Sequence, residues 1–257
     1  MGMLEGKIAL VAGVANKRSI AWAVAQRLAE QGATLAFTYQ GERLERFVRE
    51  LAESVGSSLC IACDVADDAS IDRAFATIGD ELGGLDLLCH SIAFAHAEDL
   101  DGRFADTSRE HFGIALEISA YSLVAMAQRA EPMMEARGGG SIVTMTYLGG
   151  ERAVPGYNVM GVAKAALDSS MRYLAYDLGP KNIRVNAISA GPLRTLSARG
   201  IAGFSQMEGV IAERSPLRRG IDADDVGQAG LYLLSPMAAS VTGTILYVDS
   251  GYHAMGL

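Results

Sequence analysis

The sequence predicts a single-domain α/β fold in which seven parallel strands form a doubly wound sheet with helices on both faces. Apolar runs that favour strands alternate with helical patterns along the whole chain, which is typical of such a sheet. The chain has 257 residues, half of them hydrophobic, which is enough to bury one large core. Its 29 glycines against 6 prolines predict many tight turns between the elements.

The apolar runs and helical patterns define the elements in order. The strands are expected at residues 7–12, 34–39, 59–64, 85–91, 141–146, 184–189 and 244–248. The helices are expected at residues 20–31, 41–54, 69–82, 110–136, 156–178 and 222–234. Asp222 and Asp225 are placed to cap the last helix and to complement its dipole. Residues 191–220 show no clear period and are too many for a plain connection, so we expect a lid or binding loop at about 192–220 within one domain, 1–257.

Composition and charge exclude several classes of protein. The net charge of −8 opposes loose attachment to nucleic acid or to an anionic membrane. No stretch approaches the ~20 consecutive apolar residues of a membrane span, and the N-terminus has no signal-peptide layout. We therefore expect a cytoplasmic protein whose partner is small or recognised locally.

The three cysteines are predicted to be buried thiols. Cys60, Cys63 and Cys89 each lie in an apolar run. Cys60 and Cys63 form a C-x-x-C pattern, but no second pair follows at zinc spacing and no helix begins at the first thiol. The four histidines also lack metal spacing, so no metal site is expected.

The first strand and helix are joined by a turn that predicts a dinucleotide site of the Rossmann type. The strand ends at Gly13, and the next helix begins at Ile20 directly after Ser19. A helix N-terminus at this point faces a pyrophosphate, and Ser19 can cap the helix and donate its hydroxyl. The full G-x-G-x-x-G pattern is absent, so a plain turn with a capping serine remains an alternative.

The end of the second strand favours NADH over NADPH. Gln40 can bind a ribose hydroxyl, whereas Glu42 would repel a 2′-phosphate, and the first arginine, Arg43, falls on the following helix. A solvated strand end without a cofactor role remains the alternative. Asp64 and Ser91 end the third and fourth strands at the edge of the sheet where ligands bind, although Asp64 can equally cap a turn.

One helix carries a tyrosine and a lysine on the same face. Tyr157 and Lys164 are seven residues apart, which is two helical turns, and Met160 lies beside them. The charge of Lys164 would stabilise a tyrosine anion, and its three donors can reach ribose hydroxyls. The alternative is an ordinary helix with one aromatic residue and one surface lysine.

Together these residues resemble the short-chain dehydrogenase/reductases, and within them the enoyl-acyl carrier protein reductases of bacterial type II fatty acid synthesis. Generic members carry Tyr-x-x-x-Lys and three turn glycines, whereas this chain has Tyr157-x6-Lys164 and the single Gly13. Ala93 stands where some members carry glycine. The resemblance covers nearly the whole chain and rests on residues 13–21, 39–40, 63–65, 90–92, 147, 157, 160, 164 and 190–195.

The resemblance implies NADH-dependent reduction of a trans-2-enoyl thioester carried by acyl carrier protein. Tyr157 would hold the thioester oxygen as charge collects there, Lys164 would fix the nicotinamide ribose, and Tyr147 would wall the pocket. It also implies a homotetramer with 222 symmetry. The cofactor-binding residues implied are Gly13, Ser19, Ile20, Gln40, Asp64, Val65, Ser91, Ile92, Lys164, Pro192 and Thr195. The substrate-binding residues implied are Ala93, Tyr147, Tyr157, Met160, Ile201, Phe204 and Met207.

The expected lid has its own character. Apolar residues punctuate it, as in a lid over an acyl chain, although Phe204 and Met207 can equally be core residues of a short helix. It also carries a basic excess, which could dock an acidic carrier protein; solvated arginines or a subunit contact explain the same charges. The charged residues from 191 to 220 are Arg194, Arg199, Arg214, Arg218 and Arg219 against Glu208 and Glu213.

Two rival functions remain. A carbonyl or 3-ketoacyl reductase of the same superfamily would require a serine before a Tyr-x-x-x-Lys, and neither is present. A nicotinamide-binding module without catalysis is possible on this fold, because fold does not fix function. The presence of both Tyr157 and Lys164 favours an enzyme.

Overall fold

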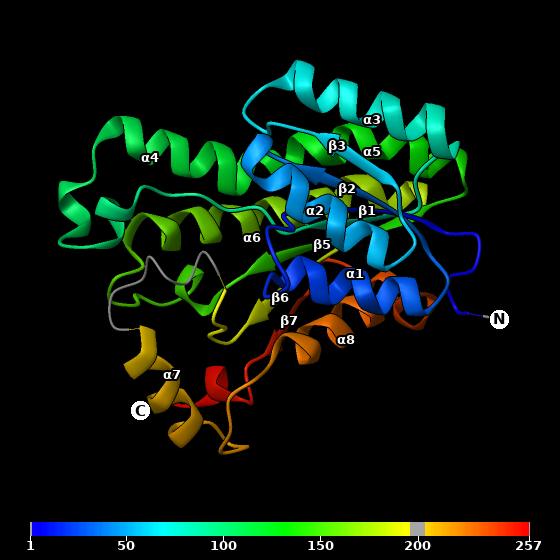
Figure 1. Ribbon diagram of the computed structural model, residues 1–257. Helices are drawn as coiled ribbons and strands as arrows, with labels where there is room; N and C mark the ends of the chain where they lie inside the picture. The colour runs from blue at the N-terminus through cyan, green and yellow to red at the C-terminus, as the bar shows by residue number, and fades with distance from the viewer. Residues whose placement is uncertain (1, 196–203, 257) are drawn as a thin grey trace.

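A computed structural model describes residues 2–195 and 204–256, with the side chains of 204–208 excepted. Seven parallel strands form one sheet in the order β3-β2-β1-β4-β5-β6-β7 (Figure 1). The predicted doubly wound fold is confirmed. The strands are β1 (Ile8–Ala12), β2 (Thr34–Tyr39), β3 (Leu59–Ala62), β4 (Leu87–His90), β5 (Gly140–Thr146), β6 (Ile183–Ala190) and β7 (Ile245–Val248).

Helices cover both faces of the sheet, and each face has its own apolar core. α1, α2 and α8 pack on one face, where alternate strand residues such as Ala9 and Val11 point. α3, α5 and α6 pack on the other face against Leu10 and Ala12. The helices are α1 (Ile20–Glu30), α2 (Glu42–Ser54), α3 (Asp68–Leu82), α4 (Arg109–Leu116), α5 (Ser122–Ala136), α6 (Asn158–Leu178), α7 (Phe204–Arg214) and α8 (Ala223–Leu234).

The structure departs from the predicted elements in two places. The helix expected at residues 110–136 is divided into α4 and α5 by a π-helical turn, Glu117–Tyr121. Within that turn the Ser119 hydroxyl bonds both the N–H and the carbonyl of Phe94, at 2.9 and 3.0 Å, so the turn is fixed to the loop after β4. The stretch without a clear period contains α7.

Other local predictions are confirmed. Asp222 and Asp225 form a reciprocal capping box at the start of α8. Cys60, Cys63 and Cys89 are buried thiols, and burial raises the pKa of Cys63 to about 11 and that of Cys89 to about 12. Among the described residues, no helix is long and apolar enough to cross a membrane.

Candidate active site

The strand order places a topological switch point between the carboxyl ends of β1 and β4. The chain proceeds outward from β1 to β3 and then returns to β4 beside β1, which creates the switch point where doubly wound sheets bind ligands. Gly13 lies at this point with φ +100°, and a Cβ there would lie 2.0 Å from the Ser91 carbonyl oxygen. Only glycine permits this close approach of the two strand ends. This close approach of Gly13 to Ser91 is the backbone arrangement expected of a dinucleotide-binding turn.

Ser19 organises the turn after Gly13. Its hydroxyl accepts hydrogen bonds from the N–H groups of Ala15 and Asn16, at 3.0 and 3.1 Å. The predicted cap on α1 is wrong, because Ser19 occupies the N-cap position but makes no side-chain bond to the helix. The hydroxyl bonds backward into the turn instead, and its own hydrogen can still be donated to a ligand. Ile20 begins α1, as predicted.

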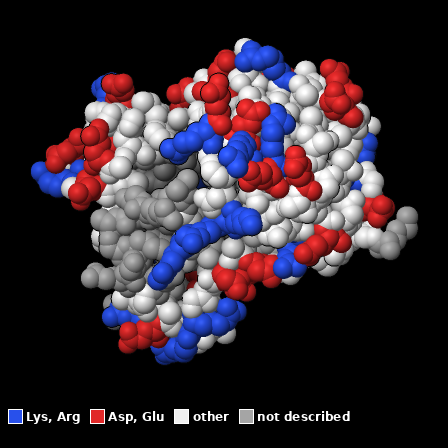
Figure 2. Space-filling model, in the orientation of Figure 1, with Lys and Arg blue, Asp and Glu red and all other residues white. Residues whose placement is uncertain are grey.

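The end of β2 presents an acidic helix start. Gln40 and Gly41 are exposed, and α2 begins with Glu42, followed by Glu45 in its first turn. Arg43 lies on α2, as predicted. Figure 2 shows acidic and basic side chains interleaved over α2. Glu42 is the first charged residue after the strand and disfavours a phosphate there, whereas Glu45 is paired with Arg49 at 2.7 Å.

The predicted residues after β3 and β4 reach the same edge of the sheet. Asp64 lies two residues beyond β3, and its Oδ1 accepts from the Ala66 N–H at 3.0 Å, which is the turn role that the sequence left open. Val65 and Ile92 are half-buried against the core that contains α3. Ser91 is half-buried beside Gly13, whereas Ala93 is exposed.

Tyr147 and Tyr157 form a packed pair at the carboxyl end of β5. Their rings lie edge to face, with centroids 4.9 Å apart. A Cβ on Gly149 would lie 2.4 Å from Tyr157 Cδ1, and a Cβ on Gly161 would lie 2.7 Å from the Gly149 carbonyl oxygen. The turn after β5 can pack on α6 and bring the tyrosines together only because both positions are glycine. Sequence reasoning gave these glycines no role.

The tyrosine pair belongs to a small apolar cluster that is separate from the two cores. Tyr157 and Met160 pack there with Ala163 and Leu100, and Tyr147 lies at its border. The prediction that Met160 lies beside Tyr157 is confirmed, with Tyr157 at the N-cap of α6 and Met160 in its first turn. Such a surface can cover an acyl chain or a flat ring and exclude water from it.

Tyr157 is a neutral phenol in this setting. Burial raises its pKa, and the neighbouring Tyr147 and Asp168 raise it further. Burial is the largest cause of this shift, and stabilisation of a tyrosine anion by Lys164 stays a prediction. Tyr157 can therefore act as a hydrogen-bond donor rather than as an anion.

Lys164 is almost completely buried, with 6% of its surface exposed. Its Nζ donates to the Met145 carbonyl oxygen at 2.8 Å, which fixes the side chain against β5. Burial lowers its pKa to about 8, and the charge of Asp168, one turn further along α6, opposes that shift. Burial likewise raises the pKa of Asp168, although Thr146 and Lys164 lower it. The surface-lysine alternative is thus excluded.

Two buried polar residues beside this lysine were not predicted. His90 is fully buried at the end of β4, where its ring nitrogens lie 2.9 Å from Thr144 Oγ1 and 2.8 Å from Ser122 Oγ. Burial and the charge of Lys164 lower the pKa of His90 to about 3, so the ring is neutral. His90 followed an apolar run and Asp168 lies four residues after Lys164, but neither pattern alone indicates a site.

The remaining predicted residues lie in or near the expected lid. Pro192 and Thr195 follow β6 and are half-buried. Ile201 lies outside the described residues, and Phe204 and Met207 lie on α7 with side chains that are likewise outside them.

The arginines of this region differ in their surroundings. Arg219 pairs with Asp225 at 3.2 Å, and Arg218 donates to the Glu213 carbonyl oxygen. Arg214 is exposed at the end of α7. Figure 2 shows basic side chains gathered there with acidic ones among them. Part of the basic excess therefore has a structural role.

A glycine turn at the switch point, with a tyrosine at the N-cap of α6 and a buried lysine within that helix, is typical of an oxidoreductase of the short-chain dehydrogenase/reductase type. A family model described as "Enoyl-(Acyl carrier protein) reductase" matches residues 13–253. The chain belongs to the enoyl-acyl carrier protein reductase family.

Similar proteins cover the chain from end to end. It is 53% identical to an enoyl-[acyl-carrier-protein] reductase [NADH] of Bacillus cereus, over 100% of both chains. It is 51% identical to the corresponding enzyme of Staphylococcus aureus, named for NADPH, over 98% of both. The structure of the Bacillus cereus reductase with NADP+ and indole naphthyridinone superimposes with a TM-score of 0.97, over 100% of both chains at 53% identity. A reductase of Anaplasma phagocytophilum in complex with NAD gives 0.95, over 100% of this chain and 97% of the other, at 47% identity.

Proposed function

We propose that this chain is an NADH-dependent enoyl-acyl carrier protein reductase that reduces the trans-2 double bond of enoyl thioesters in bacterial type II fatty acid synthesis. The observation that carries the proposal is the Tyr147–Tyr157 pair, packed over an apolar cluster beside the buried Lys164. Full-length relatives at about half identity carry the same activity in their names.

Tyr157 holds the thioester oxygen during the reaction. NADH, when bound, would supply a hydride for C3 of the substrate; negative charge would collect on the thioester oxygen as an enolate, and addition of a proton at C2 would complete the reduction. The buried, neutral phenol of Tyr157 donates a hydrogen bond to that oxygen. A preorganised donor of this kind is worth ~3–4 kcal/mol in the transition state. Tyr147 packs against Tyr157 and walls the pocket.

Lys164 holds the cofactor ribose. One of its hydrogens is donated to the Met145 carbonyl oxygen, so the ammonium is fixed in one place and has two hydrogens left for ligand hydroxyls. Gly13, Ser19 and Ile20 bind the pyrophosphate at the start of α1, and Gln40 binds the adenosine ribose. Asp64, Val65, Ser91, Ile92, Pro192 and Thr195 complete the cofactor site.

NADH is the cofactor that the end of β2 favours. Both NADH and NADPH occur in the names of relatives, so membership of the family does not by itself determine which cofactor this chain uses. In this chain Glu42 and Glu45 lie in the first turn of α2, directly after Gln40 and Gly41. The charge of Glu42 opposes the additional phosphate of NADPH, whereas Glu45 is paired with Arg49 at 2.7 Å.

The substrate arrives on an acyl carrier protein. We propose that residues at about 192–220 form a lid that shields the acyl chain of the substrate, with Ile201, Phe204 and Met207 in contact with it. Ala93 and Met160 would line the pocket wall. Exposed Arg214 contributes to a docking surface for the acidic carrier.

The enzyme works in the cytoplasm as a homotetramer. Tyr173 and Tyr176 on α6, with 71% and 81% of their surface exposed, supply apolar surface for a subunit contact.

One assay separates this function from its rivals. NADH oxidation is followed with crotonyl thioester, with acetoacetyl thioester and with no substrate. We expect oxidation with the enoyl substrate alone. Oxidation with acetoacetyl thioester would indicate a carbonyl reductase, and no oxidation with either would indicate a binding module.

A further inference from the structure

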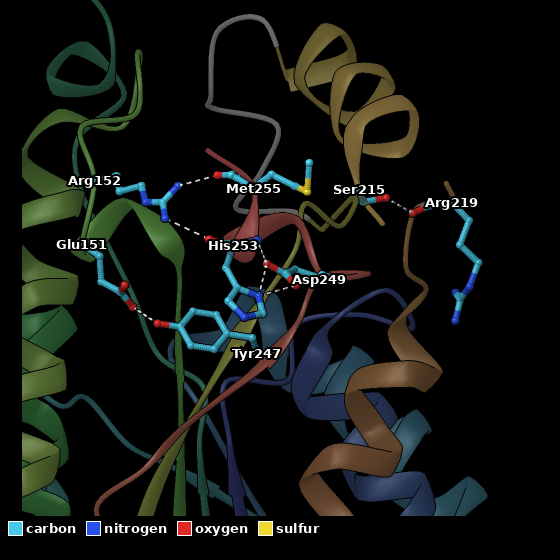
Figure 3. A network of polar contacts seen from close by, with 9 residues as sticks. Glu151, Arg152, Ser215, Arg219, Tyr247, Asp249, His253 and Met255 are labelled. Carbon is cyan, nitrogen blue, oxygen red and sulfur yellow. Dashed lines mark hydrogen bonds and ion pairs between the residues drawn. The ribbon is translucent and has the colours of Figure 1, made fainter. Parts of the chain in front are cut away.

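The loop that carries both tyrosines is joined to the far end of the chain. Arg152 lies in this loop, residues 147–157, and its guanidinium binds two backbone carbonyls of the C-terminal segment, residues 249–255 (Figure 3). Nη2 donates to the His253 oxygen at 2.9 Å, and Nη1 donates to the Met255 oxygen at 3.3 Å. Two bonds from one planar group fix direction as well as distance.

A second contact lies beside the first. The carboxylate of Glu151 accepts a hydrogen bond from the Tyr247 hydroxyl, and the Tyr247 ring stacks on the His253 ring with centroids 3.9 Å apart and planes 14° from parallel. Figure 3 shows that these side chains bridge the loop and the end of β7. Glu151 therefore contacts β7, and the stacked ring of Tyr247 joins that contact to the segment that Arg152 binds.

The C-terminal segment is itself well fixed. Asp249 is buried, with 6% of its surface exposed, and its carboxylate accepts from the N–H of Gly251 at 2.9 Å and of His253 at 2.8 Å. The Nδ1 of His253 also lies 2.9 Å from Asp249 Oδ1. The backbone that Arg152 binds is thus held in one conformation.

The same segment contacts the parts of the chain that continue from β6. The N–H of Gly191 donates to the Val248 carbonyl at 2.8 Å, and a Cβ on Gly191 would lie 3.2 Å from Asp249 Cα. Leu217 N–H donates to the Ser250 carbonyl at 3.2 Å. The segment is a junction between the tyrosine loop, the start of the cofactor-binding stretch and the region after α7.

We propose that Arg152 is a positioning residue for enoyl reduction: by binding the C-terminal segment, it holds Tyr147 and Tyr157 in place relative to the cofactor-binding stretch that begins at Gly191. This inference rests on the proposed function. Burial raises the pKa of Tyr147 to about 12, and Tyr252, at the start of the bound turn, adds to that shift. A misplacement of ~1 Å remote from the chemistry can cost a factor of ~100 in rate.

The first test compares Arg152→Ala with Arg129→Ala. Arg129 is a matched control, because it also joins two elements, α5 to α3, through Asp72 at 2.8 Å and Asp68 at 3.1 Å, away from the site. We expect Arg152→Ala to lower kcat for crotonyl thioester ~10- to 100-fold, with the Kd for NADH within ~2-fold of wild type. Arg129→Ala should leave kcat unchanged, whatever its effect on the melting temperature.

A double-mutant cycle tests the mechanism. A chain ending after Gly251 lacks both carbonyls that Arg152 binds and also lacks Tyr252 and His253, so it should lose kcat by at least the same factor, and adding Arg152→Ala to it should change nothing further. If the loss of kcat in the double variant equals the product of the two single losses, Arg152 acts independently of the C-terminal segment and the proposal is overturned. If the shortened chain does not fold, a chain ending after Ala254 replaces it. That chain lacks only the Met255 carbonyl, so adding Arg152→Ala should bring its kcat to that of Arg152→Ala alone, and a further loss overturns the proposal.

These outcomes are distinct from failure of the proposed function. If wild-type protein does not reduce crotonyl thioester, the proposed function fails. If wild type is active and Arg152→Ala keeps its kcat, or loses NADH affinity in equal measure, only the positioning role fails.

Discussion

The rings of Tyr147 and Tyr157 meet edge to face at 4.9 Å, beside a glycine that has no space for a side chain. A Cβ at Gly149 would overlap the Tyr157 ring at 2.4 Å and approach Tyr147 Cδ1 at 3.1 Å. The packing of the two tyrosine rings therefore depends on the absence of a side chain at Gly149.

Gly149→Ala should separate the tyrosines without unfolding the protein. We expect kcat for crotonyl thioester to fall ~10- to 100-fold, because the pocket is displaced. Gly113→Ala is the control, since nothing lies within 4 Å of a Cβ there. Steady-state kinetics and melting temperatures of both variants check the prediction; a Gly149→Ala enzyme with wild-type kcat would contradict it.

Lys164 should make stability depend on pH. Its pKa is lowered from the ordinary 10.5 to about 8 on folding, so burial of the charged form is penalised below pH 8, and the penalty disappears as pH rises to 10.5. Over that interval the unfolded chain binds more protons, so stability rises with pH by up to ~3 kcal/mol from this group. Urea unfolding of wild type and Lys164→Met at pH 7 and pH 10 should show that gain in wild type only. Parallel changes in both proteins would refute it.

Lys164→Ala should also weaken NADH binding more than it slows the chemical step. The ribose loses its fixed ammonium partner, whereas the Tyr157 donor remains. Titration of NADH fluorescence measures the Kd directly. An unchanged Kd would remove the ribose role.

Cofactor preference should respond to charge at the end of β2. Wild type should prefer NADH by more than tenfold, which is ~1.4 kcal/mol. Gly41 has φ +73°, so an arginine there would be strained, and Gln40→Arg with Glu42→Lys is the better test. The double variant should narrow the preference, as measured by kcat/KM for each cofactor. Equal use of both cofactors by wild type would show that the residues after β2 do not determine the preference for NADH over NADPH.

Carrier docking should depend on Arg214 and not on Arg219. Arg214→Glu should raise KM for the carrier-bound enoyl substrate ~3- to 10-fold and leave enoyl-CoA little changed, and added salt should mimic it. Arg219→Glu is the control, because Arg219 already pairs with Asp225. Equal responses of both substrates would place the docking surface elsewhere.

Patterns local in sequence predicted most of the fold and part of the site. Periodicity located all seven strands, and spacing placed Met160 and Lys164 on one helix, which begins one residue after Tyr157. Contacts between distant segments could not be predicted. Three of these contacts depend on tertiary packing. They are the close approach of Gly149 to Gly161, the hydrogen bond that the Ser19 hydroxyl accepts from the preceding turn, and the hydrogen bonds of Arg152 to a segment about 100 residues away. The π-helical turn depends likewise on Ser119 meeting the loop after β4.

The central claim is that Tyr157 donates to the charge that develops on the thioester oxygen, and Tyr157→Phe tests it most directly. The change removes one hydroxyl and keeps the ring that packs on Tyr147. Stopped-flow measurement of the chemical step with crotonyl thioester should show a rate ~100- to 1,000-fold below wild type, with NADH affinity nearly unchanged. A Tyr157→Phe enzyme that reduces the substrate at the wild-type rate would contradict the claim.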